Sequence, residues 1–172
     1  MKIVTDRLEM TQITVKDWDL YQSLNRDPAV IKFCFDEPSP KEIKDNFNSR
    51  LPVWTKVSDH WLCLTIIASE TGEKIGVTGF RMRDGAAEVG FLIQPKYHGL
   101  GYGTESLKSL INWACEEQDI QSFNAVVTEG NIGSEKVLTK CGFSLKEVIP
   151  EAYEIGGKLY ADHVYQYGKI VL

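Results

Sequence analysis

Hydrophobic and polar positions repeat with different periods along the chain, and these periods predict its helices and strands. Over residues 102–118, apolar side chains recur at the i, i+3, i+4, i+7, i+8 spacing of one helical face. These positions are Leu107, Leu110, Ile111, Ala114 and Cys115. The spacing predicts an amphipathic helix that packs on a sheet through this stripe.

The middle of the chain has the pattern of strands. Residues 61–68, 75–82 and 88–93 are short runs rich in Ile, Val, Thr and aromatic side chains. Turn signals separate these runs, first at 70–73 and then at Asp84-Gly85. The three runs therefore predict an antiparallel meander.

Two helices are predicted in the N-terminal third, after a first strand. Each helix start has the pattern of a capping box, in which one side chain caps the backbone and an acidic side chain three residues later reaches back. One box is Thr14 with Asp17, and the other is Ser39 with Glu42, where Pro40 also suits a first helical position. The predicted elements are a strand over 3–10, a helix over 16–24 that Asp27-Pro28 ends, and a second helix that ends near Pro52.

The C-terminal third predicts two further helix and strand alternations. Its elements are a strand over 122–128, a helix over 134–141 ended by Gly142, and strands over 143–148 and 158–169. The predicted order is βααβββαβαββ. We expect one domain over residues 1–172 of the α/β (α+β) class, with a mixed, mostly antiparallel central sheet and helices on both faces.

Composition and charge narrow the classes of function. The 172 residues are 43% hydrophobic and 25% charged, which is typical of a folded globular domain. The formal net charge is -5 and no Lys/Arg-rich run is present, so nucleic acid is a poor candidate for a partner. This acidity would suit a cationic partner such as an amine or a basic peptide, although solubility explains it equally well.

Cysteine spacing and hydropathy give further expectations. The four cysteines form no CxxC pair and no cluster with His, so we expect buried, reduced thiols and no metal site; they are Cys34, Cys63, Cys115 and Cys141. No stretch approaches the ~18–20 apolar residues that a membrane span needs, and the first residues contain no apolar leader. We therefore expect a cytoplasmic protein with no membrane partner. The sequence leaves both a monomer and a homodimer open.

A glycine-rich segment lies between the strand that ends at Pro95 and the helix over 102–118. It consists of His98, Gly99, Leu100, Gly101, Tyr102, Gly103 and Thr104. Glycines permit tight or left-handed turns, and the free amides at a helix start attract an anion such as pyrophosphate. A connector without a ligand explains the same spacing, so the segment alone leaves both interpretations open.

A second polar group, Asn131 with Ser134, follows the strand over 122–128. Ligands bind where parallel strands end, and both this group and the glycine-rich segment should emerge there. The alternatives are structural: Asn131 would be a helix N-cap, and Ser134 an exposed helix residue.

Together these segments resemble the GNAT superfamily of acetyl-CoA-dependent N-acetyltransferases, and within it the Rim-type enzymes that acetylate ribosomal-protein N-termini. The resemblance covers nearly the whole chain. Its motifs are Thr5-Asp6-Arg7-Leu8, the strand 88–93, the segment 97–105, Asn131-Ile132-Gly133-Ser134 and Lys140-Cys141-Gly142-Phe143. One position departs from the superfamily's Gln/Arg-x-x-Gly-x-Gly/Ala pattern, which begins here with His98.

The resemblance implies where acetyl-CoA binds. The strands over 88–93 and 122–128 would splay apart, and the pantetheine arm would pair with backbone groups of one of them. The implied cofactor-binding residues are Leu92 and Ile93 on that strand, the amides of Leu100, Gly101, Tyr102, Gly103 and Thr104 under the diphosphate, His98 and Gly99 before them, and Asn131 and Ser134 opposite.

The resemblance also implies a reaction in which a neutral amine attacks the thioester and the CoA thiolate leaves. Ser134 would donate a hydrogen bond to the leaving sulfur, while Asn131 holds the pantetheine arm. The base that takes the proton from the amine stays open. The candidates are Glu88, which we favour as the third catalytic residue, ordered water, and Glu151 or Glu154 in a loop over the acceptor site.

The acceptor implied by this branch is a ribosomal-protein or other peptide N-terminus. A small-molecule amine such as a polyamine or an antibiotic is the second choice, and a non-catalytic acyl-CoA-binding module is a rival of a different class. An aromatic, acidic pocket would suit an amine, although core packing is the simpler explanation for any one aromatic. The residues of the acceptor side would be Tyr21, Phe33, Phe35, Asp36, Trp54, Trp61 and Phe80.

Overall fold

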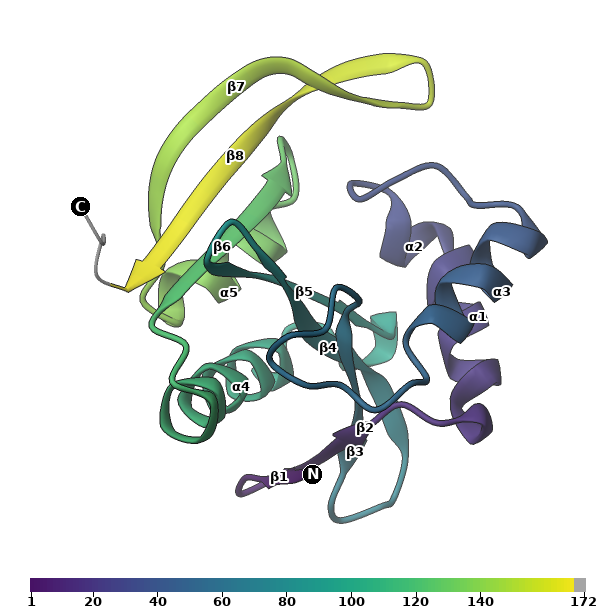
Figure 1. Ribbon diagram of the computed structural model, residues 1–172. Helices are drawn as coiled ribbons and strands as arrows, with labels where there is room; N and C mark the ends of the chain where they lie inside the picture. The colour runs from purple at the N-terminus through teal and green to yellow at the C-terminus, as the bar shows by residue number, and fades with distance from the viewer. Residues whose placement is uncertain (169–172) are drawn as a thin grey trace.

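The computed structural model describes residues 1–168 (Figure 1). The strands are β1 (Lys2–Val4), β2 (Leu8–Gln12), β3 (Leu62–Ala68), β4 (Lys74–Arg83), β5 (Ala86–Ile93), β6 (Ser122–Thr128), β7 (Ser144–Ile155) and β8 (Lys158–Gly168). The helices are α1 (Trp18–Arg26), α2 (Pro28–Ile31), α3 (Pro40–Ser49), α4 (Tyr102–Gln118) and α5 (Ile132–Lys140). The strands form one sheet in the order β1-β2-β3-β4-β5-β6-β8-β7. Neighbouring strands are antiparallel except β5 and β6, which confirms the predicted mixed, mostly antiparallel sheet.

Apolar side chains cover both faces of the sheet. On one face, the stripe of α4 packs on the strands in a cluster that includes Leu62, Phe80 and Leu107, all fully buried. On the other face, α1 and α3 contribute Tyr21 and Phe47 to a smaller cluster over β3 and β4. The sheet is therefore enclosed between α4 and the N-terminal helices, as the sequence predicts.

Local sequence signals placed several elements correctly. Helix α4 and strand β6 have the bounds that their periodicity predicts. Both capping boxes are present. In the second, the Ser39 hydroxyl accepts a hydrogen bond from the Glu42 amide at 3.1 Å, and the Glu42 carboxylate accepts one from the Ser39 amide at 2.7 Å. The first box opens a short 3-10 turn, Val15–Asp17, so α1 begins at Trp18 and not at the predicted residue 16.

In the N-terminal third, one prediction is wrong and one helix was not predicted. The single strand over 3–10 is instead the hairpin of β1 and β2, because the chain turns where the Thr5 amide bonds to the Leu8 carbonyl at 2.9 Å. The predicted end of the first helix at Asp27-Pro28 is confirmed, since α1 ends at Arg26. The sequence did not predict the helix that follows, in which Asp27 is the N-cap and Pro28 the first residue of α2. The predicted order therefore lacks one strand and one helix.

The C-terminal hairpin of β7 and β8 is longer than predicted. Its first strand was expected to end at residue 148, but β7 continues through two register shifts and a left-handed residue, Glu151 (φ 49°). Figure 1 shows the hairpin extending over the molecule toward the side of α2, and the Gly156 amide donates to the Asp36 carboxylate there at 2.8 Å. Lys169, the last residue predicted for the final strand, lies outside the described residues.

All four cysteines are free thiols. Cys63 and Cys141 are buried as predicted, whereas Cys34 and Cys115 are half-buried. No helix in the described part of the chain has the length and apolar character of a membrane-crossing segment. Within residues 1–168, no three His, Cys, Asp or Glu side chains gather in a way that could hold a metal ion.

An ion pair between the buried Asp17 and the partly exposed Lys74 fixes the start of α1 to the sheet. The Asp17 carboxylate accepts the Thr14 amide at 2.8 Å and pairs with the Lys74 ammonium of β4 at 2.7 Å. Burial alone would raise the pKa of Asp17, but the hydrogen bonds from Lys74 and Thr14 outweigh it and lower the pKa below its usual value.

We predict that Asp17→Asn lowers the free energy of unfolding by about 2 kcal/mol at pH 7, since it removes a charged hydrogen-bond partner from a buried site. Because the folded-state pKa is depressed, this contribution is present above the pKa of the unfolded chain and is lost as the pH falls through the folded pKa. Urea unfolding of both proteins at neutral and acidic pH should show the difference shrinking in acid. Asp45→Asn, which breaks the exposed Lys41–Asp45 pair, is the matched control and should change stability far less. Equal losses in the two variants, or a loss independent of pH, would contradict the prediction.

Candidate functional site

Strands β5 and β6 separate after a short parallel contact. They pair only at Ala87 with Phe123 and at Glu88 with Asn124, while β5 stays paired with β4 along its whole length. The second half of β5 therefore has no strand partner on its β6 side. The expected splay of these two strands is present.

Strand alternation determines which backbone groups face this gap. The Gln94 amide donates to the Ile75 carbonyl of β4 at 2.9 Å, so the backbone of Leu92, two residues earlier, also points toward β4. The backbone groups of Phe91 and Ile93 point the opposite way, into the gap. The Ile93 carbonyl accepts a hydrogen bond from His98 Nε2 at 2.6 Å, and this bond ties the glycine-rich segment to the end of β5.

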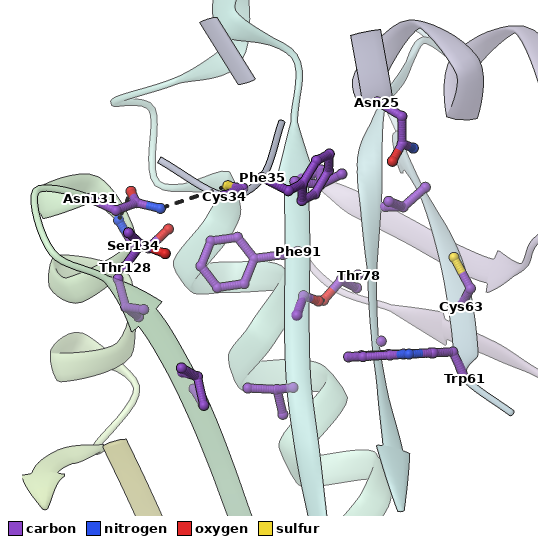
Figure 2. A pocket seen from close by; sticks show the side chains of 18 of the residues that line it. Asn25, Cys34, Phe35, Trp61, Cys63, Thr78, Phe91, Thr128, Asn131 and Ser134 are labelled. Atoms are coloured by element: carbon purple, nitrogen blue, oxygen red, sulfur yellow. Dashed lines mark hydrogen bonds between the residues drawn. The ribbon is translucent and has the colours of Figure 1, made fainter. Parts of the chain in front are cut away.

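Two cavities meet in the gap. The wide cavity, of about 490 Å³, lies between the glycine-rich segment, the start of α5 and the segment around α2. The narrow cavity, of about 290 Å³, lies between β4, β5, β6 and the N-terminal helices. The residues that line both are Phe33, Cys34, Phe91, Leu92, Asn131 and Ser134. Figure 2 shows Phe91 reaching from its strand toward Ser134 and Thr128 on one side, with Trp61 and Cys63 beyond Thr78 on the other.

The glycine-rich segment forms one wall of the wide cavity and leads into α4. Gly99 and Gly101 have left-handed backbones (φ 73° and 84°), and Gly101 is the N-cap of α4 without any side-chain cap. The first amides of α4 consequently have no capping side chain and lie beside the cavity, where an anion would be favoured. All of the predicted cofactor-binding residues line the wide cavity except Leu100, which is 53% exposed.

An ion pair from the N-terminal hairpin holds this segment from outside. The carboxylate of Glu105, in the first turn of α4, accepts hydrogen bonds from Arg7 Nε at 2.7 Å and from the Thr5 hydroxyl at 2.6 Å. Arg7 also donates from Nη1 to the Leu100 carbonyl at 3.0 Å, and its guanidinium lies 4.3 Å from the centre of the Tyr102 ring. Burial alone would raise the pKa of Glu105, but hydrogen bonds from Thr5 and Arg7 outweigh it and lower the pKa. Sequence reasoning noted Arg7 only as part of a motif and missed this role.

The start of α5 forms the opposite wall. Asn131 is the N-cap, as the structural alternative proposed, and its Oδ1 accepts the Ser134 amide at 3.3 Å. The Asn131 Nδ2 lies 4.0 Å from the Cys34 sulfur, a contact drawn in Figure 2. Burial raises the pKa of the Cys34 thiol, which is therefore protonated at neutral pH. Capping the helix and lining the cavities are thus compatible roles for Asn131.

A hydrogen-bonded cluster behind Ser134 fixes α5 to β8. The next residue, Glu135, accepts hydrogen bonds from His163 Nδ1 and, at 3.0 Å, from the Tyr165 hydroxyl. Burial raises the pKa of Tyr165, and the bond to Glu135 adds to this shift. His163 therefore serves to anchor the helix that carries Ser134.

The carboxylates considered as bases lie away from both cavities. Glu88 sits at the closed end of the gap and pairs with Arg83 at 3.2 Å. Glu151 and Glu154 are exposed on β7, not in a loop as expected, because that strand continues beyond residue 148. None of the three lines either cavity.

The aromatic residues expected on the acceptor side divide into two groups. Trp54 and Phe80 are core residues, with their rings edge to face at 5.2 Å. The others line the narrow cavity: Tyr21, Phe33, Phe35 and Trp61. The expectation of an acidic pocket is wrong, because Asp36 bonds to the C-terminal hairpin and the charged side chain in this lining is Arg50.

The family model described as an acetyltransferase (GNAT) domain matches residues 7–144. Among curated proteins, the uncharacterized N-acetyltransferase YjdG of Bacillus subtilis (strain 168) is 34% identical over 53% of this chain and 54% of its own length. The chain thus spans about half of that relative. The uncharacterized N-acetyltransferase p20 of Bacillus licheniformis is 24% identical over 91% of this chain and 90% of its own length.

Solved structures share the fold along nearly the whole chain. One is described as RimL, a ribosomal L7/L12 alpha-N-protein acetyltransferase in complex with coenzyme A, with a TM-score of 0.84, 19% identity and 98% coverage of both chains. Another is a spermidine N-acetyltransferase from Vibrio cholerae in complex with CoA and spermine, with a TM-score of 0.81, 15% identity, and coverage of 95% of this chain and 96% of that one. The fold of residues 1–168 is therefore the one that these enzymes share.

Proposed function

This chain belongs to the GNAT acetyltransferase family, and from that premise we propose that it transfers the acetyl group of acetyl-CoA to the α-amino group of a protein N-terminus. The proposal includes the Rim-type branch, with a ribosomal protein as the favoured acceptor, and a cytoplasmic location. The observation that carries it is the unpaired edge of β5, which leads directly to the uncapped amides of α4.

The residues along this path fit coenzyme A. Its diphosphate would be held by backbone amides at the start of α4, from Leu100 to Thr104, where the helix dipole favours negative charge. Its pantetheine arm carries amides that can pair with the free backbone of β5. Because the backbone of Leu92 points toward β4, we assign these contacts to Phe91 and Ile93 in place of Leu92. Because backbone amides would hold the diphosphate, the Gln or Arg side chain that usually begins the superfamily's pattern is not required, and His98 can occupy that position.

Ser134 and Asn131 stand where the two cavities meet, which is where transfer would take place. The amine nitrogen forms a bond to the thioester carbonyl carbon, the carbon–sulfur bond breaks, and the products are an amide and CoA thiol. We propose that the Ser134 hydroxyl donates a hydrogen bond to the departing sulfur and that Asn131 positions Ser134 through its amide. A backbone amide of β5 facing the gap would polarise the carbonyl.

The proton released by the amine would leave through water in the open cavities, since Glu88 pairs with Arg83 at the closed end of the gap. This route favours an acceptor that is often neutral at physiological pH. An α-amino group has a pKa of about 7.7–8.0 and an alkylamine one of about 10.4, so the neutral fraction at pH 7.5 differs by about 200-fold. The larger neutral fraction favours an N-terminus over a polyamine, although a spermidine enzyme shares the fold.

The function is tested by two measurements on the intact protein. Acetyl-CoA at a hundred times its dissociation constant should stabilise the fold by about 2.7 kcal/mol, and peptides with a free N-terminus should gain one acetyl group by mass spectrometry. The same peptides with a blocked N-terminus are the matched control and should remain unchanged. Binding without transfer to any amine would indicate an acyl-CoA-binding module, and the absence of a thermal shift would contradict the cofactor assignment.

We predict that Ser134→Ala lowers turnover by about 10- to 100-fold, the effect of losing one hydrogen bond to a charged sulfur, with acetyl-CoA affinity near normal. The variant keeps the backbone amide that Asn131 caps, so α5 should stay folded. Thr139→Ala, on the same helix and outside both cavities, is the control. Equal turnover in the Ser134 variant and its parent would remove Ser134 from the mechanism.

Arg7→Ala should raise the KM for acetyl-CoA about tenfold, because the segment that would hold the diphosphate loses its outer support. Acetyl-pantetheine lacks the diphosphate, so its KM should be unchanged in the same variant. Lys2→Ala removes another charge from the same hairpin and should affect neither thioester. If both thioesters lose activity in parallel, Arg7 supports the fold in general and not the diphosphate segment.

A further inference from the structure

The narrow cavity contains a guanidinium held between two aromatic rings. Arg50 follows the last residue of α3 and donates from Nη1 to the Asn46 carbonyl at 2.8 Å. Its guanidinium carbon lies 5.6 Å from the ring centre of Tyr21 and 5.8 Å from that of Trp61. Both rings line the same cavity, and cation–π attraction at these distances holds the positive charge at the wall.

The charge of Arg50 is not neutralised within residues 1–168. None of the ion pairs in this part of the chain includes Arg50, and its lining neighbours in the narrow cavity are aromatic, aliphatic or uncharged polar residues. A guanidinium has five N–H donors, of which one bonds to Asn46. The remaining donors suit a planar anion, which arginine binds through two parallel hydrogen bonds.

The rest of the cavity suits the carbon skeleton that would carry such an anion. Trp61, Phe35 and Phe91 offer apolar faces, and Asn25, whose Nδ2 donates to the Tyr21 carbonyl at 2.8 Å, adds a polar group. At about 290 Å³ the cavity is at the lower end of the range for ligand sites, about 300–1,000 Å³. Its size matches one residue or a small molecule better than a folded segment.

We infer that the acceptor amine carries a carboxylate, which Arg50 binds in the narrow cavity while the amine reaches Ser134. This inference rests on the proposed function and specifies its substrate class. Two sources present the same chemistry: a peptide N-terminus with an acidic side chain in its first residues, and a free amino acid. A polyamine presents a second ammonium group in place of the carboxylate, and Arg50 would repel it.

The test uses pairs of acceptors that differ in this charge. Rates are compared per neutral amine, because amidation of a free amino acid also lowers the pKa of its amine. One arm compares peptides that begin Ser-Asp or Ser-Glu with peptides that begin Ser-Asn or Ser-Gln. A second arm compares free phenylalanine with its amide, and spermidine is assayed beside both. Release of CoA thiol gives kcat/KM for each acceptor, and we expect the acid of the productive pair to exceed its amide by at least about tenfold. The arm that shows the preference identifies the source of the carboxylate.

Arg50→Gln should remove the preference by raising the KM for the acid at least about tenfold more than the KM for the amide, while the KM for acetyl-CoA stays at the parent value. The unchanged KM for acetyl-CoA also shows that the variant is folded. Arg50→Lys should retain part of the preference, because it keeps the charge and loses the bidentate geometry. Lys41→Gln removes one positive charge from the same helix, outside the cavity, and should leave the preference intact.

Equal use of acid and amide by the parent, a preference that survives in Arg50→Gln, or spermidine as the best acceptor would overturn the inference. Each of these results still requires acetyl transfer, so the acetyltransferase activity stands. Spermidine as the best acceptor would, in addition, overturn the choice of a protein N-terminus as the acceptor. No transfer to any amine, with no thermal shift by acetyl-CoA, would instead overturn the proposed function.

Discussion

The early end of pairing between β5 and β6 is the constraint on which the rest of the site depends. After the pairs at Ala87 and Glu88, the β5 backbone has donors and acceptors with no strand beside them. Unpaired backbone groups are costly when buried in protein, so this edge is stable only if it faces water or a ligand. Strand β6 is in the same position, because it pairs with β8 from Ser122 to Thr128 but with β5 only at Phe123 and Asn124. The fold thus opens two facing strand edges, and each of the two strands keeps its partner on the far side.

The glycine-rich segment is fixed by two sets of hydrogen bonds, one to the strand just before it and one to a residue remote in sequence, Arg7. His98 bonds to the end of β5, and Arg7 bonds to Leu100 and to Glu105 in α4. Because glycines can adopt many backbone conformations, the segment alone would not favour one of them. The bonds of His98 and Arg7 limit the conformations that it can adopt. Preorganised amides lose less entropy when an anion binds, which is the physical basis for assigning the phosphate site to backbone and not to side chains.

Sequence reasoning worked where the signal is local. The stripe of α4, the box of Ser39 with Glu42 and the N-cap Asn131 each depend on residues within two turns of one another. It failed where two elements must meet: the hairpin inside residues 3–10, the continuation of β7, and the location of Glu88 are set by pairing across the sheet. No period in the sequence records such pairing. The ion pair between Arg7 and Glu105 joins residues that are 98 apart in the sequence. The sequence indicated Arg7 only through the short motif Thr5-Asp6-Arg7-Leu8.

The two cavities are lined by different kinds of group, and this difference lets them vary independently. The wide cavity is framed by backbone groups of β5 and of the start of α4, which change little with side-chain substitution. The narrow cavity is walled by side chains from α1, from the end of α3 and from the strands, including Tyr21, Arg50 and Trp61. Substitutions in the N-terminal third can therefore change the narrow cavity while the backbone frame of the wide cavity stays the same. The charge in the narrow cavity also differs in sign from that of the whole chain, since a chain of net charge -5 places the guanidinium of Arg50 in this lining.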